Sequence, residues 1–191
     1  MPKRRIGAVP YLYPVPIVLV GARVAGRANY ATVGDCAVMG IRPPVVAVSL
    51  GESAFTTKGI LEVGSFSINV PATEQLPLVD YFGTISGSDV DKSALVESFA
   101  GTNPDIPLLS DCPVSLECEV VEACQVEHRR IFIAKVFETH VDERFISDVE
   151  GQPRIAPLPK LDPILYALDN TYYSVGKPIG TGYAEAASFS E

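Results

Sequence analysis

The sequence predicts a mostly-β fold, a barrel with a few short helices attached. At least five segments are short, rich in β-branched residues and bounded by proline, glycine or polar turns, as strands are. Helical periodicity is limited to two short segments, 53–63 and 73–82. The long helices and glycine fingerprint of a dinucleotide-binding α/β fold are missing. We therefore expect one domain over residues 1–191, with an extended tail at about 177–191.

Composition narrows the classes of function. Hydrophobic residues make up 47% of the chain, which suits a domain with a packed core. The net charge of −8 argues against a nucleic-acid partner, which needs a basic surface. No apolar run approaches the roughly 20 residues of a membrane helix. The basic start at Lys3-Arg4-Arg5 is not followed by a signal-peptide core, so we expect a cytoplasmic protein.

The first half of the chain supplies three strands and two helices. Residues 15–23 and the continuous apolar run 45–50 predict strands, the second of them buried. Residues 65–70 alternate apolar and polar side chains, which predicts a half-buried strand. Residues 83–92 are polar and contain glycine, so they predict a surface loop. The candidate N-caps of the first helix are Ser53, Thr56 and Thr57.

The second half predicts a long hairpin. Residues 114–126 and 131–141 are extended, apolar and joined by a short turn. Glu122 interrupts the apolar positions of the first strand, which indicates a bulge or an interface there. Cys118 and Cys124 share the parity of its apolar residues, so we interpret both as small core residues. Four prolines between residues 151 and 163 predict a long loop.

Residues 29–50 have the layout strand, ligand loop, turn, strand. The first part is small and polar, so its main-chain N–H groups are open to a ligand. Thr32, Asp35 and Cys36 add side-chain groups beside that loop, and Ser49 ends the following strand. Cys36 can pack against a ligand ring or take a redox role. Each hydroxyl, taken alone, is as well explained by a turn or a helix cap.

These segments together resemble the flavin reductase-like family, in particular its flavoredoxin-like branch. The similarity lies in the order and spacing of several motifs, at residues 13–20, 29–36, 43–45, 66–71, 86–92, 112–118 and 172–176. It implies a split β-barrel that binds FMN and forms a homodimer.

The resemblance also implies a set of cofactor contacts. The residues expected to contact FMN are Asn29, Thr32, Val33, Gly34, Asp35, Cys36, Ser49, Ser53, Thr56, Thr57, Lys92, Arg129 and Tyr166. Lys92 is either a solvated surface charge or the cation that stabilises reduced, anionic flavin. We expect no catalytic triad and no metal site, because the chain's two histidines, His128 and His140, form no such grouping.

Two positions depart from the family pattern. Asp35 stands where flavoredoxin-like relatives carry an aromatic residue, typically tryptophan, and a carboxylate beside reduced flavin is unfavourable. Before the strand at 131, relatives tend to show Gly-Asp-His in a place linked to pyridine nucleotide. Here Arg129 takes the histidine position, and His128 is one residue away. Nicotinamide use is therefore less supported than FMN binding.

Three hypotheses follow for the function. The first is an FMN-dependent oxidoreductase that takes electrons from NAD(P)H or a redox partner protein. The second is a non-catalytic FMN carrier or sensor, since the chemistry belongs to the flavin in either case. The third is a structural split-barrel protein without flavin, which Asp35 keeps open.

The long hairpin predicts a homodimer with the flavin near the interface. Its strands carry apolar residues on both faces, whereas a strand with one wet face alternates. The second apolar face needs cover, and a two-fold partner would supply it. The turn 128–130 and the region of Tyr166 would then reach the partner's flavin. In the alternative, the tail and the proline-rich loop cover this face within one chain.

Overall fold

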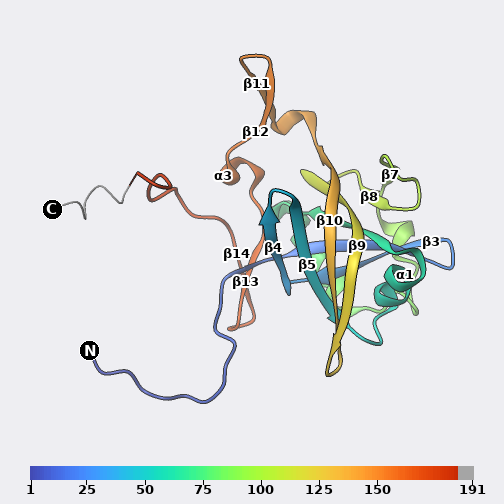
Figure 1. Cartoon of the computed structure of the whole chain (residues 1–191), viewed down its shortest axis with the longest axis horizontal. Coiled ribbons are helices and arrows are strands. Elements are labelled where there is room, and N and C mark those ends of the chain that lie inside the picture. Colours follow the sequence, from blue (N-terminus) through green and yellow to red (C-terminus); the bar gives the residue numbers. More distant parts are fainter. Residues whose placement is uncertain (185–191) are drawn as a thin grey trace.

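The computed structural model describes residues 1–184 and is built around a curled antiparallel sheet (Figure 1). Its seven strands follow the order β3-β2-β6-β9-β10-β5-β4. The strands are β1 (Val15–Pro16), β2 (Val18–Val24), β3 (Arg27–Val33), β4 (Cys36–Ile41), β5 (Pro44–Gly51), β6 (Ser65–Val70), β7 (Ser98–Ala100), β8 (Pro107–Leu109), β9 (Val114–Val126), β10 (Arg129–Val141), β11 (Ile146–Val149), β12 (Gln152–Ile155), β13 (Leu165–Ala167) and β14 (Thr171–Tyr173). The helices are α1 (Phe55–Val63), α2 (Leu76–Thr84) and α3 (Leu158–Leu161), with single 3₁₀ turns at Thr73–Gln75, Lys92–Leu95 and Glu143–Phe145.

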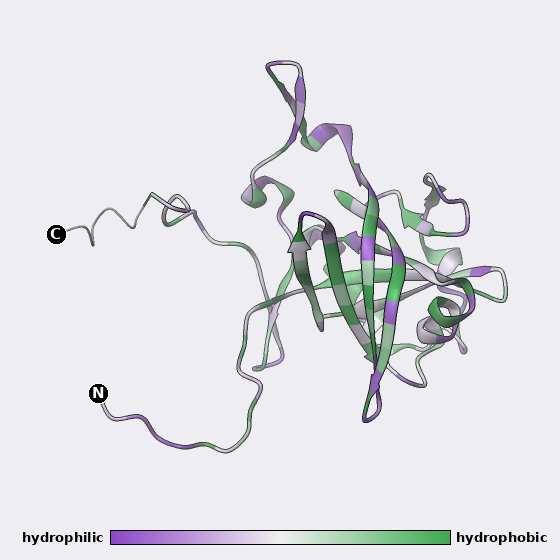
Figure 2. Cartoon of the chain, in the orientation of Figure 1, coloured by the Kyte–Doolittle hydropathy of each residue, from purple (hydrophilic) through white to green (hydrophobic). Residues whose placement is uncertain are grey.

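The sheet closes on itself around one core. β2 and β5 are far apart in the strand order, yet Val20 of β2 and Val48 of β5 belong to the same buried cluster. Phe66 and Phe132 meet inside it, with ring centroids 6.5 Å apart. Hydrophobic residues are concentrated in these strands (Figure 2). Inward-facing side chains from both ends of a sheet can meet only if the sheet curls, so the predicted mostly-β barrel is confirmed.

Strand β6 has the predicted limits but is buried on both faces. Asn69 is fully buried: its amide donates to Leu19 O at 3.0 Å, and its Oδ1 accepts from Leu109 N at 2.9 Å. Ser67 donates to Pro107 O at 2.6 Å. The polar residues of β6 thus hold β8 against the sheet instead of facing water, and the predicted half-buried strand is wrong. Alternation alone does not distinguish solvated polar side chains from hydrogen-bonded buried ones.

The hairpin β9–β10 carries the predicted bulge, and the bulge changes which cysteine is buried. Glu122 pairs with Ile133, but the next pair joins Val120 to Ala134, so one residue of β9 is extra. An extra residue moves the following side chains to the opposite face. Cys118 is fully buried, as predicted, and its burial raises its thiol pKa to about 12. Cys124 is exposed, so its predicted place in the core is wrong.

The predicted ligand loop is mostly strand. Residues 27–33 pair with β2, and residues 36–41 pair with β5. Only Gly34 and Asp35 connect the two strands, and the N–H of Ser49 donates to the main-chain oxygen of Asp35 at 2.8 Å. Small residues are weak strand formers, but pairing on the sheet overrides that preference. The first predicted strand is split at Ile17, whose N–H instead donates to Ile164 O at 3.0 Å.

Helix α1 packs closely on the barrel. A Cβ on Gly59 would lie 2.3 Å from the main-chain oxygen of Arg23, so only glycine allows this approach to β2. The N-cap is Ala54 and makes no side-chain cap hydrogen bond. The predicted caps Ser53, Thr56 and Thr57 are therefore wrong, and the first N–H groups of the helix are left without a side-chain cap.

The C-terminal third is more structured than predicted. The proline-rich segment 151–163 contains β12 and α3, where a loop was expected, because β12 pairs with β11. Residues 174–184 form no helix or strand, and the rest of the predicted tail lies outside the described residues. The N-terminal residues and the described part of the C-terminal tail, residues 174–184, run away from the barrel (Figure 1). Within residues 1–184, no helix is long and apolar enough to cross a bilayer.

Candidate functional site

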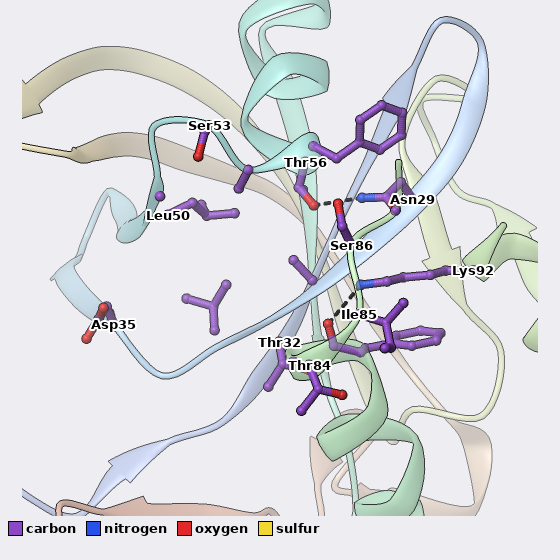
Figure 3. Close-up of a pocket in the computed structure, with 18 of the residues that line it drawn as sticks. Asn29, Thr32, Asp35, Leu50, Ser53, Thr56, Thr84, Ile85, Ser86 and Lys92 are labelled. Atoms are coloured by element: carbon purple, nitrogen blue, oxygen red, sulfur yellow. Dashed lines mark hydrogen bonds between the residues drawn. The ribbon is translucent and has the colours of Figure 1, made fainter. Parts of the chain in front are cut away.

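A cavity of about 450 Å³ lies where β3, the end of β5, the start of α1 and the end of α2 meet (Figure 3). Ten of the predicted site residues line it: Asn29, Thr32, Val33, Gly34, Asp35, Ser49, Ser53, Thr56, Lys92 and Arg129. They come from five separate parts of the chain, and the fold brings them to one place. The volume lies in the range of small-molecule and cofactor sites.

Three predicted site residues lie outside this cavity. The thiol of Cys36 lies 3.7 Å from Pro16 O, and burial, with Asp35 contributing less, raises its pKa to about 11. Thr57 is buried and donates to Gly51 O at 2.8 Å, which holds the turn before α1. Tyr166 lines a smaller neighbouring cavity.

Sequence reasoning missed the last turn of α2 and the loop that follows it. Residues 82–87 line the cavity opposite the start of α1, and they include two hydroxyl side chains, Thr84 and Ser86. The other unpredicted lining residues are Ala31, Leu50, Gly51, Ala54 and Phe55. The sequence signal for this part of the site is the polar, glycine-containing composition of residues 83–92. From the sequence alone, these residues are interpreted as a surface loop. A loop of that composition can equally well line a site.

Close packing fixes the polar end of the cavity. Asn29 is buried on β3, and its Nδ2 donates to Thr56 Oγ1 at 2.7 Å. Gly87 lies against this pair, since a Cβ there would fall 1.8 Å from Asn29 Oδ1. Thr32 donates to Val79 O at 2.5 Å, which ties β3 to α2. Hydroxyl and amide groups are thereby held in place around the cavity.

Lys92 is a buried cation on the wall of this cavity. It is 3% exposed, and its Nζ donates to Phe82 O at 2.8 Å and to Tyr30 O at 3.0 Å. Nζ also lies 5.1 Å from the centroid of the Phe82 ring. Burial lowers the pKa of Lys92 to about 8. Lys92 is therefore not a solvated surface charge.

The environment of Lys92 leaves its charge unbalanced. Among residues 1–184, no carboxylate forms an ion pair with it, and the adjacent Asp91 pairs with Arg27 at 3.7 Å. A lysine ammonium has three donors, and the two carbonyls occupy two of them. One donor remains for a group in the cavity. A buried cation without a counter-charge is unfavourable, so this position suits an anionic ligand.

Asp35 and Arg129, the two residues that depart from the family pattern, are bonded to each other. Arg129 forms an ion pair with Asp35. Its Nε donates to Ser49 Oγ at 3.1 Å, and its terminal nitrogen donates to Ser49 O at 2.6 Å. Asp35 and Lys92 lie at opposite ends of the cavity (Figure 3). The carboxylate of Asp35 is thus neutralised, and the pair leaves little net charge at this end.

Comparison with known proteins agrees with this geometry. Residues 11–170 match the model of the family described as flavin reductase like domain. The chain belongs to the flavin reductase-like family. The match covers the barrel, both walls of the cavity and the hairpin β9–β10.

Solved members of this family have the same fold. Flavoredoxin from Methanosarcina acetivorans is 33% identical, with a TM-score of 0.91 over 99% of this chain and 100% of that chain. Flavoredoxin of Desulfovibrio vulgaris (Miyazaki F) is 30% identical, with a TM-score of 0.83 over 95% and 98%. The NADH-dependent FMN reductase AsuE2 of Streptomyces nodosus subsp. asukaensis is 28% identical over 74% of each chain. The expected split barrel and the flavoredoxin-like branch are confirmed.

Proposed function

We propose that this flavin reductase-like protein binds FMN in the main cavity and passes electrons through it. The observation that carries the proposal is Lys92, a buried cation with a free donor and no carboxylate partner among the described residues. FMN is anionic through its phosphate and, once reduced, through its ring. The family and the FMN reductase among its relatives support flavin over other anions.

The polar groups around the cavity match the needs of such a ligand. Ser53 and Thr56 place hydroxyls at the start of α1, whose N–H groups have no side-chain cap. Ser86 faces them from the other wall, and these groups together suit a phosphate. Val33 and Leu50 supply apolar contact for a ring. When bound, FMN supplies one- and two-electron transfer, and the protein orients it and sets its electrostatics.

Two ends of the cavity then perform different tasks. Lys92 holds positive charge where the ligand is buried, which favours the anionic reduced state. At the other end, Arg129 neutralises Asp35, so that the carboxylate does not oppose reduction. The ion pair takes the place of the aromatic residue found in flavoredoxin-like relatives. The third hypothesis, a split barrel without flavin, rested mainly on Asp35. The ion pair with Arg129 removes that support.

Two classes of electron donor are compatible with this proposal, a nicotinamide nucleotide and a partner protein. An NADH-dependent relative supports NAD(P)H as the donor. Arg129 stands where related proteins tend to have a histidine, which favours the second candidate, an FMN carrier that exchanges electrons with a partner protein. Oxidation of NADH and of NADPH by the FMN-loaded protein decides between them. Turnover with either nucleotide establishes a nucleotide-dependent reductase, and turnover with neither excludes NAD(P)H as the donor and favours electron exchange with a partner protein.

We also propose a homodimer with the flavin near its interface. Ser49 and Ile131 are directly paired across β5 and β10, so their side chains share one face of the sheet, opposite the buried Phe132. Ile133, paired with Ala47, continues that face. Apolar residues thus extend from the cavity, which Ser49 lines, over the outside of the hairpin. A second copy covering this face would lie next to the flavin.

A further inference from the structure

A separate cavity of about 280 Å³ lies at the opposite end of α1 from the main cavity. Its walls are Val63, Gly64, Ser65, Asn103, Glu119 and Phe137. The main cavity borders the first residues of α1, whereas this one borders the last residue and the C-cap. The two cavities share no residue, so a ligand here would be independent of a bound flavin.

The end of α1 carries partial negative charge that no basic residue of its last turn offsets. The N–H of Gly64 donates to Ile60 O at 2.8 Å and closes the helix. The carbonyls of residues 61–63 lie beyond that last acceptor and give the helix end its negative polarity. Glu62 adds a carboxylate in the same turn. The end of α1 therefore favours a cation.

Ser65, which follows the helix directly, has a hydroxyl without a partner. The residue is 7% exposed, and within residues 1–184 its Oγ makes no hydrogen bond. Ser67 on the same strand shows the usual arrangement, because its Oγ donates to Pro107 O at 2.6 Å. Burial of a hydroxyl without a hydrogen bond costs free energy. The hydroxyl of Ser65 in the cavity wall is therefore suited to a polar ligand.

Glu119 and Phe137 add a carboxylate and an aromatic ring to this cavity. Ser65 and Glu119 are directly paired across β6 and β9, so their side chains share one face of the sheet. Lys135 pairs with Glu119 from β10, but within residues 1–184 no ion pair joins the two. Phe137 is 44% exposed, and the face of an aromatic ring attracts an ammonium group.

We propose that this cavity binds a primary ammonium group on a short apolar chain. The three N–H donors of such a group match the carboxylate of Glu119, the hydroxyl of Ser65 and a carbonyl from the end of α1. Val63 and Phe137 then pack against the chain. The group can belong to a free amine or to a lysine side chain of a partner protein, and its binding does not depend on FMN.

A metal ion suits the cavity less well than an ammonium group. Among residues 1–184, no three His, Cys, Asp or Glu side chains are grouped so that they could hold a metal ion. Calcium needs six to eight oxygen ligands, and magnesium needs an octahedral set. One carboxylate beside a hydroxyl and an aromatic ring is instead the set of partners that an organic ammonium needs.

The test is an amide NMR titration of the full-length protein with n-butylammonium chloride and, separately, with N-acetyl-lysine methylamide. A ligand of this size can reach a dissociation constant of about 1–10 mM. We expect saturable shifts of the amide signals of Val63, Gly64 and Ser65. The control compound is n-butanol, which has the same chain without the charge and should cause no such shifts.

Two variants test the contacts themselves. Glu119→Gln removes the negative charge and should weaken binding by about tenfold, because a hydrogen bond between charged groups is lost. Ser65→Ala should weaken binding by about threefold or more without lowering thermal stability, because its hydroxyl has no partner in the folded protein. Glu138→Gln is the matched control, because Glu138 is exposed next to Phe137 but does not line the cavity. It should bind as the wild type does.

Each outcome decides the proposal. Saturable shifts with both amines support the ammonium class, shifts with n-butylammonium alone identify a free amine, and shifts with the lysine derivative alone identify a lysine side chain. The absence of saturable shifts at tens of millimolar of either amine overturns the proposal. Equal shifts with n-butanol also overturn it, because no charge is then recognised. Equal weakening by Glu138→Gln and Glu119→Gln overturns it as well, because the effect then comes from overall charge.

Discussion

Lys92 and Asp35 are the two residues whose substitution tests the proposed FMN site most directly. Both side chains are charged and both line the cavity, but only Asp35 has an oppositely charged partner. Lys92 is buried with carbonyl partners only, whereas Asp35 is paired with Arg129 at a more open position. The first should attract an anionic flavin, and the second should neither attract nor repel it strongly.

FMN affinity should depend on pH through Lys92. The pKa of Lys92 is about 8 in the flavin-free protein, and a bound anion raises it because the anion favours the charged form. Affinity is therefore greatest below pH 8 and falls by up to about tenfold per pH unit above it, until the pKa of the bound state is reached. Flavin fluorescence titrations at several pH values measure this slope. In Lys92→Met the slope should vanish, and an unchanged slope would assign the effect to another group.

Asp35→Asn should strengthen FMN binding. The variant keeps a side chain of similar shape but leaves the guanidinium of Arg129, held by Ser49, without its counter-charge. An exposed ion pair of this kind is worth little, so the expected gain is only about two- to fivefold. The same titration measures it, and the double variant Asp35→Asn/Arg129→Gln should lose the gain. Weaker binding in the single variant would mean that Asp35 is itself a ligand contact.

At the scale of elements, the strands were more predictable than the site. Segments 65–70 and 114–126 have the predicted limits, because β-branched runs between breakers are strong local signals. The extent of β3 and β4 could not be predicted, since their small residues become strand only through pairing with β2 and β5. The exposure of Cys124 depends on a one-residue register shift in β9. The burial of Lys92 depends on the carbonyl of Tyr30, 62 residues earlier in the chain, and on that of Phe82 in α2, and no local pattern reveals these contacts.

The loop after α2 should tolerate no side chain at Gly87. An added Cβ would lie 1.8 Å from Asn29 Oδ1 and 2.9 Å from the ring of Phe55. Phe55 is the first residue of α1, and Asn29 is hydrogen-bonded to the next residue, Thr56. Gly87→Ala should therefore lower stability by about 1–3 kcal/mol, as overpacking does, and should also weaken FMN binding. Thermal unfolding followed by circular dichroism measures the first effect. Gly176→Ala is the matched control, because a Cβ at Gly176 has no neighbour within 4 Å.

For the whole molecule, the main expectation is the dimer. Val126 is 52% exposed at the end of β9, on the side of the hairpin where Cys124 and Ile131 pair. Val126→Asp should leave the monomer folded but place a charge in an apolar interface, and so shift the dimer toward monomer. Light scattering at low micromolar concentration should give twice 20.4 kDa for the wild type and a lower mass for the variant.

Val149→Asp is the control for this change, because Val149 is 39% exposed on the separate hairpin β11–β12. It should remain dimeric. A wild-type mass of one chain would contradict the dimer and the flavin site next to its interface.

The most direct test of the central claim is a titration of the purified, flavin-free protein with FMN, followed by quenching of flavin fluorescence. We expect saturable binding at micromolar concentration or below. Lys92→Met should weaken it by about tenfold or more, because a hydrogen bond to a charged group is lost. The exposed lysine of α1 provides the control, since Lys58→Met should bind as the wild type does. No quenching at tens of micromolar FMN, or equal affinities for the wild type and Lys92→Met, would contradict the account.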